Sequence, residues 1–264
     1  MTKKSYAKVN IFLKIVGIRE NYHLVASRFV RVKNLFDTIS FIKKDVDNFS
    51  IEGNFSCVLE KNTVYKAYKE LEKFDEVKEF FKKNIVKIDK NIPEFAGLGG
   101  GSSNCATFLN MVNIACNLNL NKEELAKIGS NIGADVPFFV YEFDSANVSG
   151  IGEIVEEFKE ELINIEVITP KIACDTGKIY KNFREKFYKE ENMQKVQDDV
   201  KELFATNSKD ILEKFSINEA NDLYFPALDL NSDLKKFEKD NWFLVEVEAH
   251  FSKFYKEIMW QKKR

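Results

Sequence analysis

The sequence predicts an α+β protein of two lobes with a cleft between them. Three observations support this prediction. Strand-like alternation fills the first part of the chain, a glycine-rich loop opens onto an apolar helical segment near residue 100, and helical patterns prevail from about Thr176 onward. Runs of strands followed by runs of helices are typical of α+β architecture. The 264 residues, 44% of them hydrophobic, suffice for one large domain or two closely packed lobes.

The first predicted strand carries two polar residues of interest. Apolar and more polar residues alternate over 8–15, and a period of two is that of a strand. The alternation places Lys8 and Asn10 on the same face. Further strand-like segments follow at 27–33, 38–43 and 48–52.

Helices and strands alternate less regularly in the rest of the chain. Asn62 is a candidate N-cap for a helix that runs to about Phe74, and a second helical stretch covers 76–83. A strand over 85–88 ends before Pro93. The other expected elements are helices at 102–116, 122–131, 192–205 and 207–214, strands at 137–149, 163–169 and 243–247, and a helix capped at 231–233.

Composition and charge exclude several classes of protein. The net charge is −2, so the basic excess of a nucleic-acid binder is absent. No apolar run approaches the length that spans a membrane, and no secretory leader pattern follows Met1. Four widely spaced cysteines form no metal-binding cluster and are typical of reduced, mostly buried thiols. We therefore expect a cytoplasmic protein without nucleic-acid or membrane partners.

Residues 97–103 read Gly-Leu-Gly-Gly-Gly-Ser-Ser. Glycines lack a Cβ where backbone must approach a ligand closely. Ser102 and Ser103 can begin the following helix, whose free N–H groups suit an anion such as a triphosphate. The segment lacks the Gly-Lys-Ser/Thr of a P-loop and the spacing of a dinucleotide fingerprint. A flexible surface turn is the alternative, but a turn seldom needs this composition directly before an apolar helix.

Three motifs carry a resemblance to known enzymes. The glycine segment with Pro93 and Asn104 resembles the second motif of the GHMP kinases. The N-terminal segment 7–13, with Arg19 and the pair Tyr22-His23, is similar to the first motif of the 4-diphosphocytidyl-2-C-methyl-D-erythritol kinase family within that superfamily. Residues 132–139, Ile-Gly-Ala-Asp-Val-Pro-Phe-Phe, are similar to another motif of the same family. The resemblance runs from Ser5 to about Leu244 and implies a small-molecule kinase of isoprenoid precursor synthesis.

The resemblance also implies the catalytic residues. Asp135 is the implied general base on the substrate hydroxyl, and Lys8 is its implied partner, which keeps the aspartate ionised. Taken alone, Asp135 would be a turn carboxylate and Lys8 a solvated strand lysine. Asn10 is expected to hydrogen-bond near Lys8 and to contribute to the substrate site.

A cytidine diphosphate compound is the implied small-molecule substrate. Tyr22 is expected to stack on its cytosine, with His23 at the edge of the base and Tyr180 as a second stacking aromatic. Stacking contributes roughly 1–3 kcal/mol per base. The family usually has Asp-Gly before Tyr-His, whereas here Arg19, Glu20 and Asn21 precede Tyr22 and the loop is one residue shorter.

ATP is the implied phosphoryl donor, and Mg²⁺ is expected to accompany it. The sequence does not fix the metal ligands, for which Ser102 and Ser103 are candidates. The expected ATP-binding residues are Pro93, Gly97, Leu98, Gly99, Gly100, Gly101, Ser102, Ser103 and Asn62. Asn62 is equally well explained as a helix cap. The expected lobes are 1–145, with the ATP-binding loop, and 146–264.

Two alternatives to this function remain open. The chain could be another GHMP kinase, acting on homoserine or mevalonate. It could also be a catalytically inactive nucleotide-binding protein. Two smaller resemblances accompany the main motifs: Gly150 to Glu153 is expected to be a hairpin near the cleft, and the segment Asn218 to Leu223 is expected to have a structural, capping role.

The C-terminal segment departs from the family. The resemblance implies a third glycine-rich motif, Ser-Gly-Ser-Gly-Ser-Ser, after Leu244, but residues 245–253 read Val-Glu-Val-Glu-Ala-His-Phe-Ser-Lys. Codons for these nine residues, read one nucleotide earlier, can encode Ser-Gly-Ser-Gly-Ser-Ser-Phe-Phe-Lys. We therefore expect 245–264 to be frameshifted and the chain to be impaired. A divergent charged tail is the alternative.

Overall fold

The computed structural model describes residues 1–20, 22–94, 97–168, 172 and 174–237, and the backbone of two strands at 242–246 and 250–254. Helices and strands both contribute substantially, so the predicted α+β class is confirmed. Across these described ranges, no helix combines the length and apolar character needed to cross a membrane.

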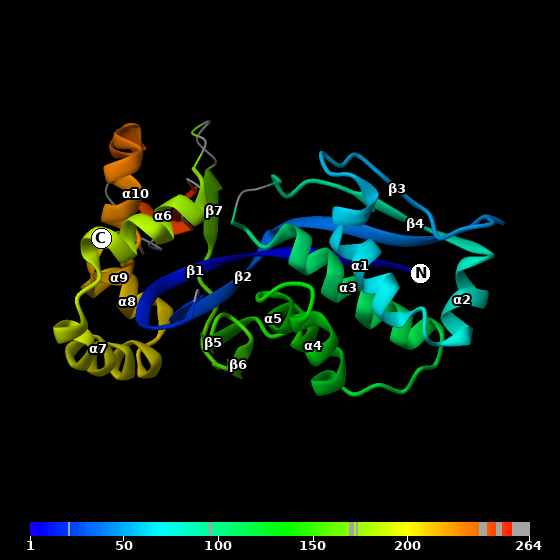
Figure 1. Ribbon diagram of the computed structural model, residues 1–264, viewed down its shortest axis with the longest axis horizontal. Helices are drawn as coiled ribbons and strands as arrows, with labels where there is room; N and C mark the ends of the chain where they lie inside the picture. The colour runs from blue at the N-terminus through cyan, green and yellow to red at the C-terminus, as the bar shows by residue number, and fades with distance from the viewer. Residues whose placement is uncertain are drawn as a thin grey trace, which may run out of the picture.

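A long hairpin of β1 (Thr2–Arg19) and β2 (Tyr22–Lys43) runs along the molecule (Figure 1). Separate strands at 27–33 and 38–43 were predicted, and that division is wrong. The two segments belong to one strand, because the pairing shifts register between Tyr6/Phe36 and Ala7/Val32 and the extra residues form a bulge. Arg19 pairs with Tyr22 across the short turn, in which Glu20 has φ of 56°.

The hairpin is part of a six-stranded sheet. Its order is β3-β4-β2-β5-β6, with β1 paired to β2. All strand pairs are antiparallel except β3 with β4. The four further strands are β3 (Ile51–Gly53), β4 (Asn84–Asp89), β5 (Ser145–Ser149) and β6 (Ile154–Glu157). The hairpin expected at Gly150–Glu153 is confirmed as the β5–β6 turn.

Five helices pack with the N-terminal part of the sheet. They are α1 (Thr63–Leu71), α2 (Asp75–Phe81), α3 (Gly100–Ala115), α4 (Lys122–Ser130) and α5 (Val136–Tyr141). A strand was predicted from residue 137, but α5 is a helix. Its run Val-Pro-Phe-Phe-Val-Tyr resembles a strand in composition, yet Pro137 lies in the first helical turn, where proline is favoured. The short helix packs closely on α4 at Gly129, where a Cβ would lie 2.5 Å from Val136.

The C-terminal half is mainly helical, as predicted. Its helices are α6 (Thr176–Asn182), α7 (Met193–Ala205), α8 (Ser208–Lys214), α9 (Ile217–Ala220) and α10 (Tyr224–Leu230). A π-helix lies at Phe183–Phe187, and 3₁₀ helices lie at Glu190–Asn192 and Ser232–Phe237. Another 3₁₀ helix, Leu59–Lys61, precedes α1 in the N-terminal half. A second sheet has the order β7-β9-β8, from β7 (Ile165–Ile168), β8 (Trp242–Glu246) and β9 (His250–Phe254).

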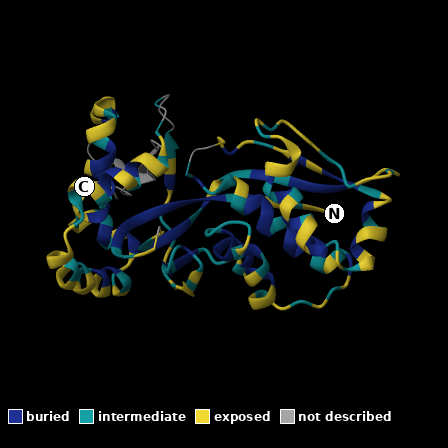
Figure 2. Cartoon of the chain, viewed as in Figure 1, coloured by how far each residue is buried: buried dark blue, intermediate teal, exposed yellow. Residues whose placement is uncertain are grey.

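Three hydrophobic clusters form the core, and the hairpin contributes to each. Phe29 and Ile39 belong to the cluster under α1–α5, Phe12 to the cluster with α7 and α8, and Leu13 and Ile15 to the cluster with α6 and α10. Figure 2 shows the hairpin buried along most of its length. Lys8 and Asn10, predicted on a polar strand face, are 1% and 4% exposed and therefore not solvated.

Buried charges tie the C-terminal helices to this hairpin. Arg28 of β2 is fully buried and its guanidinium donates to Asn147 Oδ1 and to the carbonyl of Phe204 at the end of α7. Its Nη1 lies 3.5 Å from Glu160 Oε1. Burial lowers the pKa of Arg28 to about 10, against the opposing effect of Glu160, so the side chain is charged at neutral pH.

A second tie joins the segment Asn218 to Leu223 to β1. The Asp222 carboxylate pairs with Lys14 and accepts from the backbone N–H of Ile15 at 2.8 Å. The Asp222 N–H in turn donates to the carbonyl of Leu13. The structural, capping role expected for this segment is therefore confirmed, since Glu219 accepts from the Ser216 N–H in the capping box of α9. The segment also anchors a strand through Asp222.

Candidate active site

Lys8 and Asp135 lie together, as the sequence predicted. Lys8 Nζ is 3.4 Å from Asp135 Oδ2 and donates to Asn10 Oδ1 at 2.8 Å. It also lies over the ring of Phe29, 4.5 Å from its centroid. The lysine is buried while the aspartate side chain is 29% exposed. A buried cation thus faces a carboxylate that a substrate can reach.

The carboxylate of Asp135 is not used to cap its helix. Asp135 occupies the N-cap position of α5 but makes no capping hydrogen bond with its side chain. Asp135 does lie in the turn between α4 and α5, as its sequence context alone suggested, but its carboxylate makes no capping bond there. The aspartate lies at the end of the loop from α4, held by the packing of Val136 on Gly129.

The glycine segment lies directly before the helix α3. Gly99 is its N-cap, and the first bond within the helix runs from Ser103 N–H to the Gly99 carbonyl at 2.7 Å. The preceding N–H groups, of Gly100, Gly101 and Ser102, have no partner within the helix. Because they share the positive end of the helix dipole, they suit a phosphate group. β1 supports the loop through Lys8 N–H, which donates to the Leu98 carbonyl at 3.0 Å.

Gly99 is required by its backbone conformation and by the side chains packed against it. Its φ is +68°, a conformation that favours glycine, and an added Cβ would meet the Phe139 ring at 2.7 Å and Lys8 Cγ at 3.1 Å. The missing side chain therefore makes room for Lys8 and for the Phe139 ring. Gly101 is different, since it is exposed and its Cβ would lie 3.6 Å from Thr63 Oγ1, an ordinary contact.

We expect Gly101→Ala to weaken ATP binding about tenfold, because the methyl group would lie beside the N–H groups that are expected to bind phosphate. Stability should hold or rise slightly, since alanine is favoured over glycine in a helix. Calorimetric titration with ATP and a thermal melt check the two parts. Unchanged ATP affinity in this variant would argue against a phosphate site at the start of α3.

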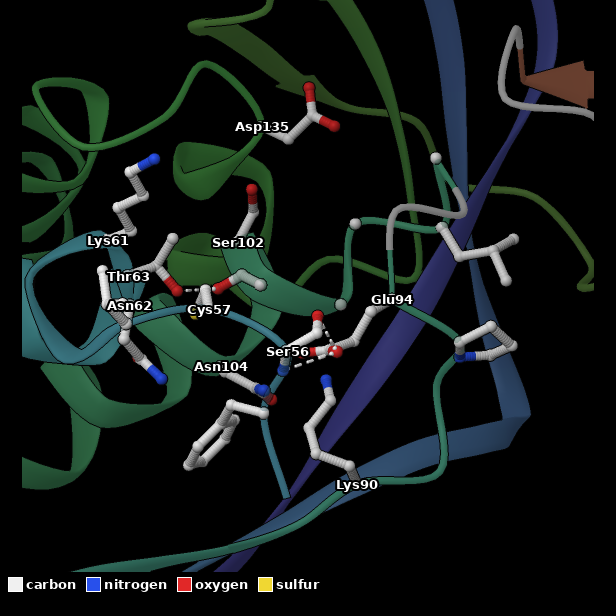
Figure 3. Close-up of a pocket in the computed structure, with 18 residues that line it drawn as sticks. Ser56, Cys57, Lys61, Asn62, Thr63, Lys90, Glu94, Ser102, Asn104 and Asp135 are labelled. Atoms are coloured by element: carbon white, nitrogen blue, oxygen red, sulfur yellow. Dashed lines mark hydrogen bonds between the residues drawn. The ribbon is translucent and has the colours of Figure 1, made fainter. Parts of the chain in front are cut away.

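A cavity of about 690 Å³ lies over the glycine segment (Figure 3). It is lined by Phe55, Ser56, Cys57, Val58, Lys61, Asn62, Thr63, Lys90, Pro93, Glu94, Gly97, Leu98, Gly99, Gly100, Gly101, Ser102, Asn104 and Asp135. In Figure 3, Asp135 and Ser102 lie toward one end and Asn104 and Lys90 toward the other. Its size and mixed lining suit a nucleotide with its phosphates near Asp135.

Most of the predicted ATP-binding residues reach this cavity, and one does not. The exception is Ser103, which is buried and accepts a hydrogen bond from Ser5 Oγ at 2.7 Å. Asn62 does line the cavity, but its Oδ1 accepts from Val64 N–H at 2.9 Å, so the capping role is confirmed.

Sequence reasoning missed several lining residues, among them Lys61, Thr63 and Lys90. Lys90 Nζ donates to Asp37 Oδ2 at 2.5 Å. Thr63 Oγ1 donates to the Gly101 carbonyl and so fixes α1 against the loop. A lysine or threonine in an ordinary sequence context carries no signal of its own. Only the proximity of Asn62 and Pro93 in the sequence could have pointed to them.

A second cavity, of about 400 Å³, gathers the residues predicted to hold a base. Tyr22, His23 and Tyr180 line it, and the rings of His23 and Tyr180 are 4.9 Å apart. The other lining residues are Val25, Ile151, Gly177, Lys181 and Arg184. Tyr22 is 58% exposed, so its ring is free to close on a ligand. Asn10 does not line this cavity.

The imidazole ring of His23 is suited to contact a neutral group. Burial, and to a smaller extent the charge of Arg184, lowers the pKa of His23 below its ordinary value. The imidazole is therefore uncharged at neutral pH. Its Nε2 is buried and has no hydrogen-bond partner. A ligand that supplies a complementary edge would satisfy this nitrogen.

The β5–β6 turn connects the two cavities. Ile151 lines the second cavity, while a Cβ on its neighbour Gly152 would lie 3.1 Å from Ala134 Cβ, one residue before Asp135. Glu153 Oε2 accepts from Ile151 N–H at 2.6 Å and fixes the turn. A molecule in the second cavity is thus close to the segment that carries Asp135.

Sequence comparisons agree with this arrangement. The family described as GHMP kinases N terminal domain matches residues 62–143. A protein of Sulfurimonas denitrificans is 51% identical over 247 residues, which cover 91% of each chain. One from Campylobacter jejuni is 41% identical, over 91% of this chain and 95% of its own. One from Helicobacter pylori is 35% identical, over 90% and 88%. All three are named 4-diphosphocytidyl-2-C-methyl-D-erythritol kinase.

Solved structures share the fold. A crystal structure of 4-(cytidine 5'-diphospho)-2C-methyl-D-erythritol kinase aligns with a TM-score of 0.73 and 22% identity, over 97% of this chain and 90% of that one. The mevalonate kinase of Methanococcus jannaschii aligns with a TM-score of 0.63 and 16% identity, over 97% and 91%. At these identities the likeness concerns the fold alone.

Proposed function

The chain belongs to the 4-diphosphocytidyl-2-C-methyl-D-erythritol kinase family, and we propose that it transfers the γ-phosphoryl group of ATP to the 2-hydroxyl of that cytidyl compound. The prediction of a small-molecule kinase agrees with the names of the relatives, of which one at 51% identity is a kinase. The observation that carries the proposal is the Lys8–Asp135 pair, which lies at one end of the cavity over the glycine segment. The second cavity with Tyr22, His23 and Tyr180 supports the choice of substrate.

The start of α3 holds the triphosphate in this proposal. N–H groups of Gly100, Gly101 and Ser102 donate to phosphate oxygens, and the helix dipole favours their charge. These donors are fixed before the reaction, so they stabilise charge without reorganising. The exposed Lys61 adds positive charge at the rim of the cavity, whereas the charge of Lys90 is paired with the buried Asp37.

Asp135 acts as the general base. Its carboxylate accepts the proton of the substrate hydroxyl as the oxygen attacks the γ-phosphorus and ADP leaves. Lys8, 3.4 Å away, stabilises the ionised carboxylate, and Asn10 holds the Lys8 ammonium in place. Because Lys8 is buried, its charge acts in a medium of low dielectric constant and is little screened.

Mg²⁺ fits the oxygen groups beside the glycine segment. No group of three or more potential metal-ligating His, Cys, Asp or Glu side chains occurs in the described part of the chain. Mg²⁺ needs no such cluster, since it commonly takes one or two protein oxygens along with phosphates and water. Ser102 and Asp135 both line the cavity, and Ser102 is free of the Ser5 contact that occupies Ser103. When bound, the ion would neutralise phosphate charge.

We expect Tyr22→Ala and Tyr180→Ala each to weaken binding of the cytidyl substrate without weakening binding of ATP. Each ring loses stacking worth roughly 1–3 kcal/mol, which raises KM for that substrate by about 5- to 100-fold while KM for ATP stays the same. Steady-state kinetics with each substrate varied in turn provides the test. Tyr188→Ala is a suitable control, because this tyrosine packs on Phe183 and does not line the cavity. Equal losses for ATP and substrate would indicate packing residues only.

A coupled assay of ADP release tests the function as a whole. We expect turnover with 4-diphosphocytidyl-2-C-methyl-D-erythritol and none with homoserine or mevalonate. A preference for either of those alcohols would assign the chain to another GHMP kinase activity. ATP binding without turnover on any of the three would indicate an inactive nucleotide-binding protein.

We also propose that residues 245–264 are translated out of frame. The recovery of Ser-Gly-Ser-Gly-Ser-Ser in the neighbouring frame supports this. Residues 247–249 and 255–264 lie outside the described residues, and of 245–246 and 250–254 only the backbone strands are described. The predicted strand 243–247 corresponds to β8, Trp242–Glu246.

Restoring the frame is expected to raise kinase activity well above that of the present chain, because the glycine motif would supply backbone donors where charged side chains now follow Leu244. Each such donor typically contributes 10²–10³-fold to a rate. The measurement is turnover of both chains side by side, after resequencing of the gene. Full activity of the present chain, with peptide masses that verify 245–264, would contradict the proposal.

We also propose how the chain is divided into lobes and where the protein is located. We assign 1–145 to the lobe with the ATP-binding loop and 146–264 to the second lobe. A cytoplasmic location is supported by the cysteines, all four of which are free. Burial raises the pKa of the thiols of Cys105 and Cys116, as suits inert reduced side chains.

A further inference from the structure

One face of α6 and of the π-helix that follows it, Phe183–Phe187, lines the second cavity. Its lining residues are Gly177, Tyr180, Lys181 and Arg184. Their spacing of i, i+3, i+4 and i+7 is that of a single helical face. Single turns of π-helix are rare and are often found at functional sites. Arg184 is the last residue of this face, and no motif of the sequence accounts for it.

Arg184 joins this helical face to the hairpin on the other side of the cavity. Its Nη2 donates to the carbonyl of Glu20 at 3.3 Å, across 164 positions of the sequence. Glu20 lies in the turn between β1 and β2, and Tyr22 and His23 follow this turn and line the cavity from the hairpin side. The guanidinium of one residue therefore connects the two walls.

The turn between β1 and β2 is one that needs support. Glu20 has φ of 56°, a left-handed conformation that costs free energy in a residue with a side chain. The turn also lacks the Asp-Gly that usually precedes Tyr-His in the family. Tyr22 is largely exposed, so few side chains hold its ring. A hydrogen bond to the Glu20 carbonyl helps to keep the turn in one conformation.

His23 lies where the two walls meet. Its ring centroid is 4.9 Å from that of Tyr180 and 6.1 Å from that of Phe183. The other titratable side chains that line the cavity are Tyr22, Tyr180, Lys181 and Arg184. Burial lowers the pKa of His23, and the charge of Arg184 lowers it further. Arg184 Nε and His23 Nε2 are both buried without a hydrogen-bond partner in the described part of the chain. Two polar atoms at this junction are thus available to a ligand.

We propose that Arg184 is a positioning residue for the second cavity, which ties the β1–β2 turn to the π-helix and so holds Tyr22 and His23 against the helix that carries Tyr180. The inference rests on the proposed cytidyl substrate. Without the tie, the turn and its two rings would have to be ordered when the ligand binds. That ordering costs free energy and weakens binding of the cytidyl group. The phosphate site at the start of α3 does not depend on this turn.

The first test measures equilibrium binding of cytidine diphosphate (CDP) and of ATP by calorimetry. Arg184→Met removes the donors and is expected to weaken CDP binding about tenfold and to leave ATP affinity within about twofold. Arg184→Lys keeps an ammonium that can donate to the Glu20 carbonyl, and should restore CDP affinity to within about threefold of the unchanged chain.

Lys186→Met is the matched control for the calorimetry. It removes a cation from the same π-helix, but Lys186 pairs with Asp229 at 2.6 Å and neither residue lines the second cavity. The affinities for CDP and ATP should both stay as they are in the unchanged chain, because an exposed ion pair contributes little.

A second readout needs no ligand. The chain has two histidines, His23 and His250, so their ring resonances can be followed by NMR as the pH is varied. Arg184→Met removes a positive charge that disfavours the imidazolium, so the pKa of His23 should rise. Arg184→Lys, which keeps the charge, and Lys186→Met should both leave this pKa low.

Two results of the calorimetry would overturn the proposal. One is a CDP affinity in folded Arg184→Met equal to that of the unchanged chain, and the other is an equal loss of affinity for CDP and ATP. If Arg184→Met does not fold, Arg184→Gln, which is too short to reach the Glu20 carbonyl, is measured in its place with the same expected results.

Failure of the proposed reaction can be told apart from failure of the tie. A chain that binds CDP through Arg184 but phosphorylates no cytidyl compound would support the tie and reject the reaction. If the unchanged chain binds no CDP, the proposed substrate is rejected, and an unshifted His23 pKa in Arg184→Met would then overturn the tie as well.

Discussion

Asp135→Asn is expected to lower turnover by roughly 10²–10⁴-fold, the usual effect of removing a general base. The amide keeps the shape of the side chain but cannot accept the proton of the attacking hydroxyl. ATP affinity should change little, because the triphosphate is held by the N–H groups at the start of α3. Single-turnover kinetics and a separate ATP titration measure the two effects.

A surface aspartate provides the control for this variant. Asp144 is 45% exposed and pairs with Lys33 and Arg31. Asp144→Asn makes the same chemical change away from both cavities and should leave turnover within about twofold. Near-normal turnover of Asp135→Asn, in a parent protein known to be active, would remove Asp135 from the mechanism.

Arg28→Met is expected to lower the free energy of unfolding by about 3–5 kcal/mol. The substitution leaves the Glu160 carboxylate, 4% exposed, without its cation, and an unpaired buried charge costs this much. It also removes donors from Asn147 Oδ1 and from the carbonyls of Leu203, Phe204 and Thr206. Urea denaturation with a constant m-value gives the measurement.

Arg31 is the matched control, since it lies on the same strand and pairs with the exposed Asp144. Arg31→Met should cost about 1 kcal/mol or less, because its partner Asp144 is exposed and solvent screens the pair. In the double variant Arg28→Met/Glu160→Gln, the loss should be smaller than the sum of the two single losses. A loss for Arg28→Met no larger than that for Arg31→Met would show that the buried pair contributes little.

The sequence predicted the glycine segment, the Lys8–Asp135 pair and the Tyr22, His23 and Tyr180 group well, because each rests on a short run of residues with a strong pattern. The structure brings each of these sets together. Ser103 shows the limit of such reasoning. Its neighbour Ser102 faces the cavity, but the turn of the helix buries Ser103 against Ser5.

Features that depend on distant packing were not predictable. The run at 136–141 has the composition of a strand, and only its packing against α4 and the position of Pro137 make it a helix. The division of β2 into two strands was wrong because the bulge opposite Tyr6 and Ala7 is set by pairing with β1. Lys90 enters the site through tertiary contacts, which local patterns do not reveal.

The long β1–β2 hairpin has a consequence for the order in which the protein forms during synthesis. Its residues emerge from the ribosome long before Leu223, Tyr224 and Leu234, which complete the cluster that covers Leu13 and Ile15. The apolar side chains of the hairpin therefore stay uncovered while about two hundred further residues are translated. Contacts between residues so far apart in the sequence are also slow to form. We expect the nascent hairpin to need chaperone protection until α10 is released.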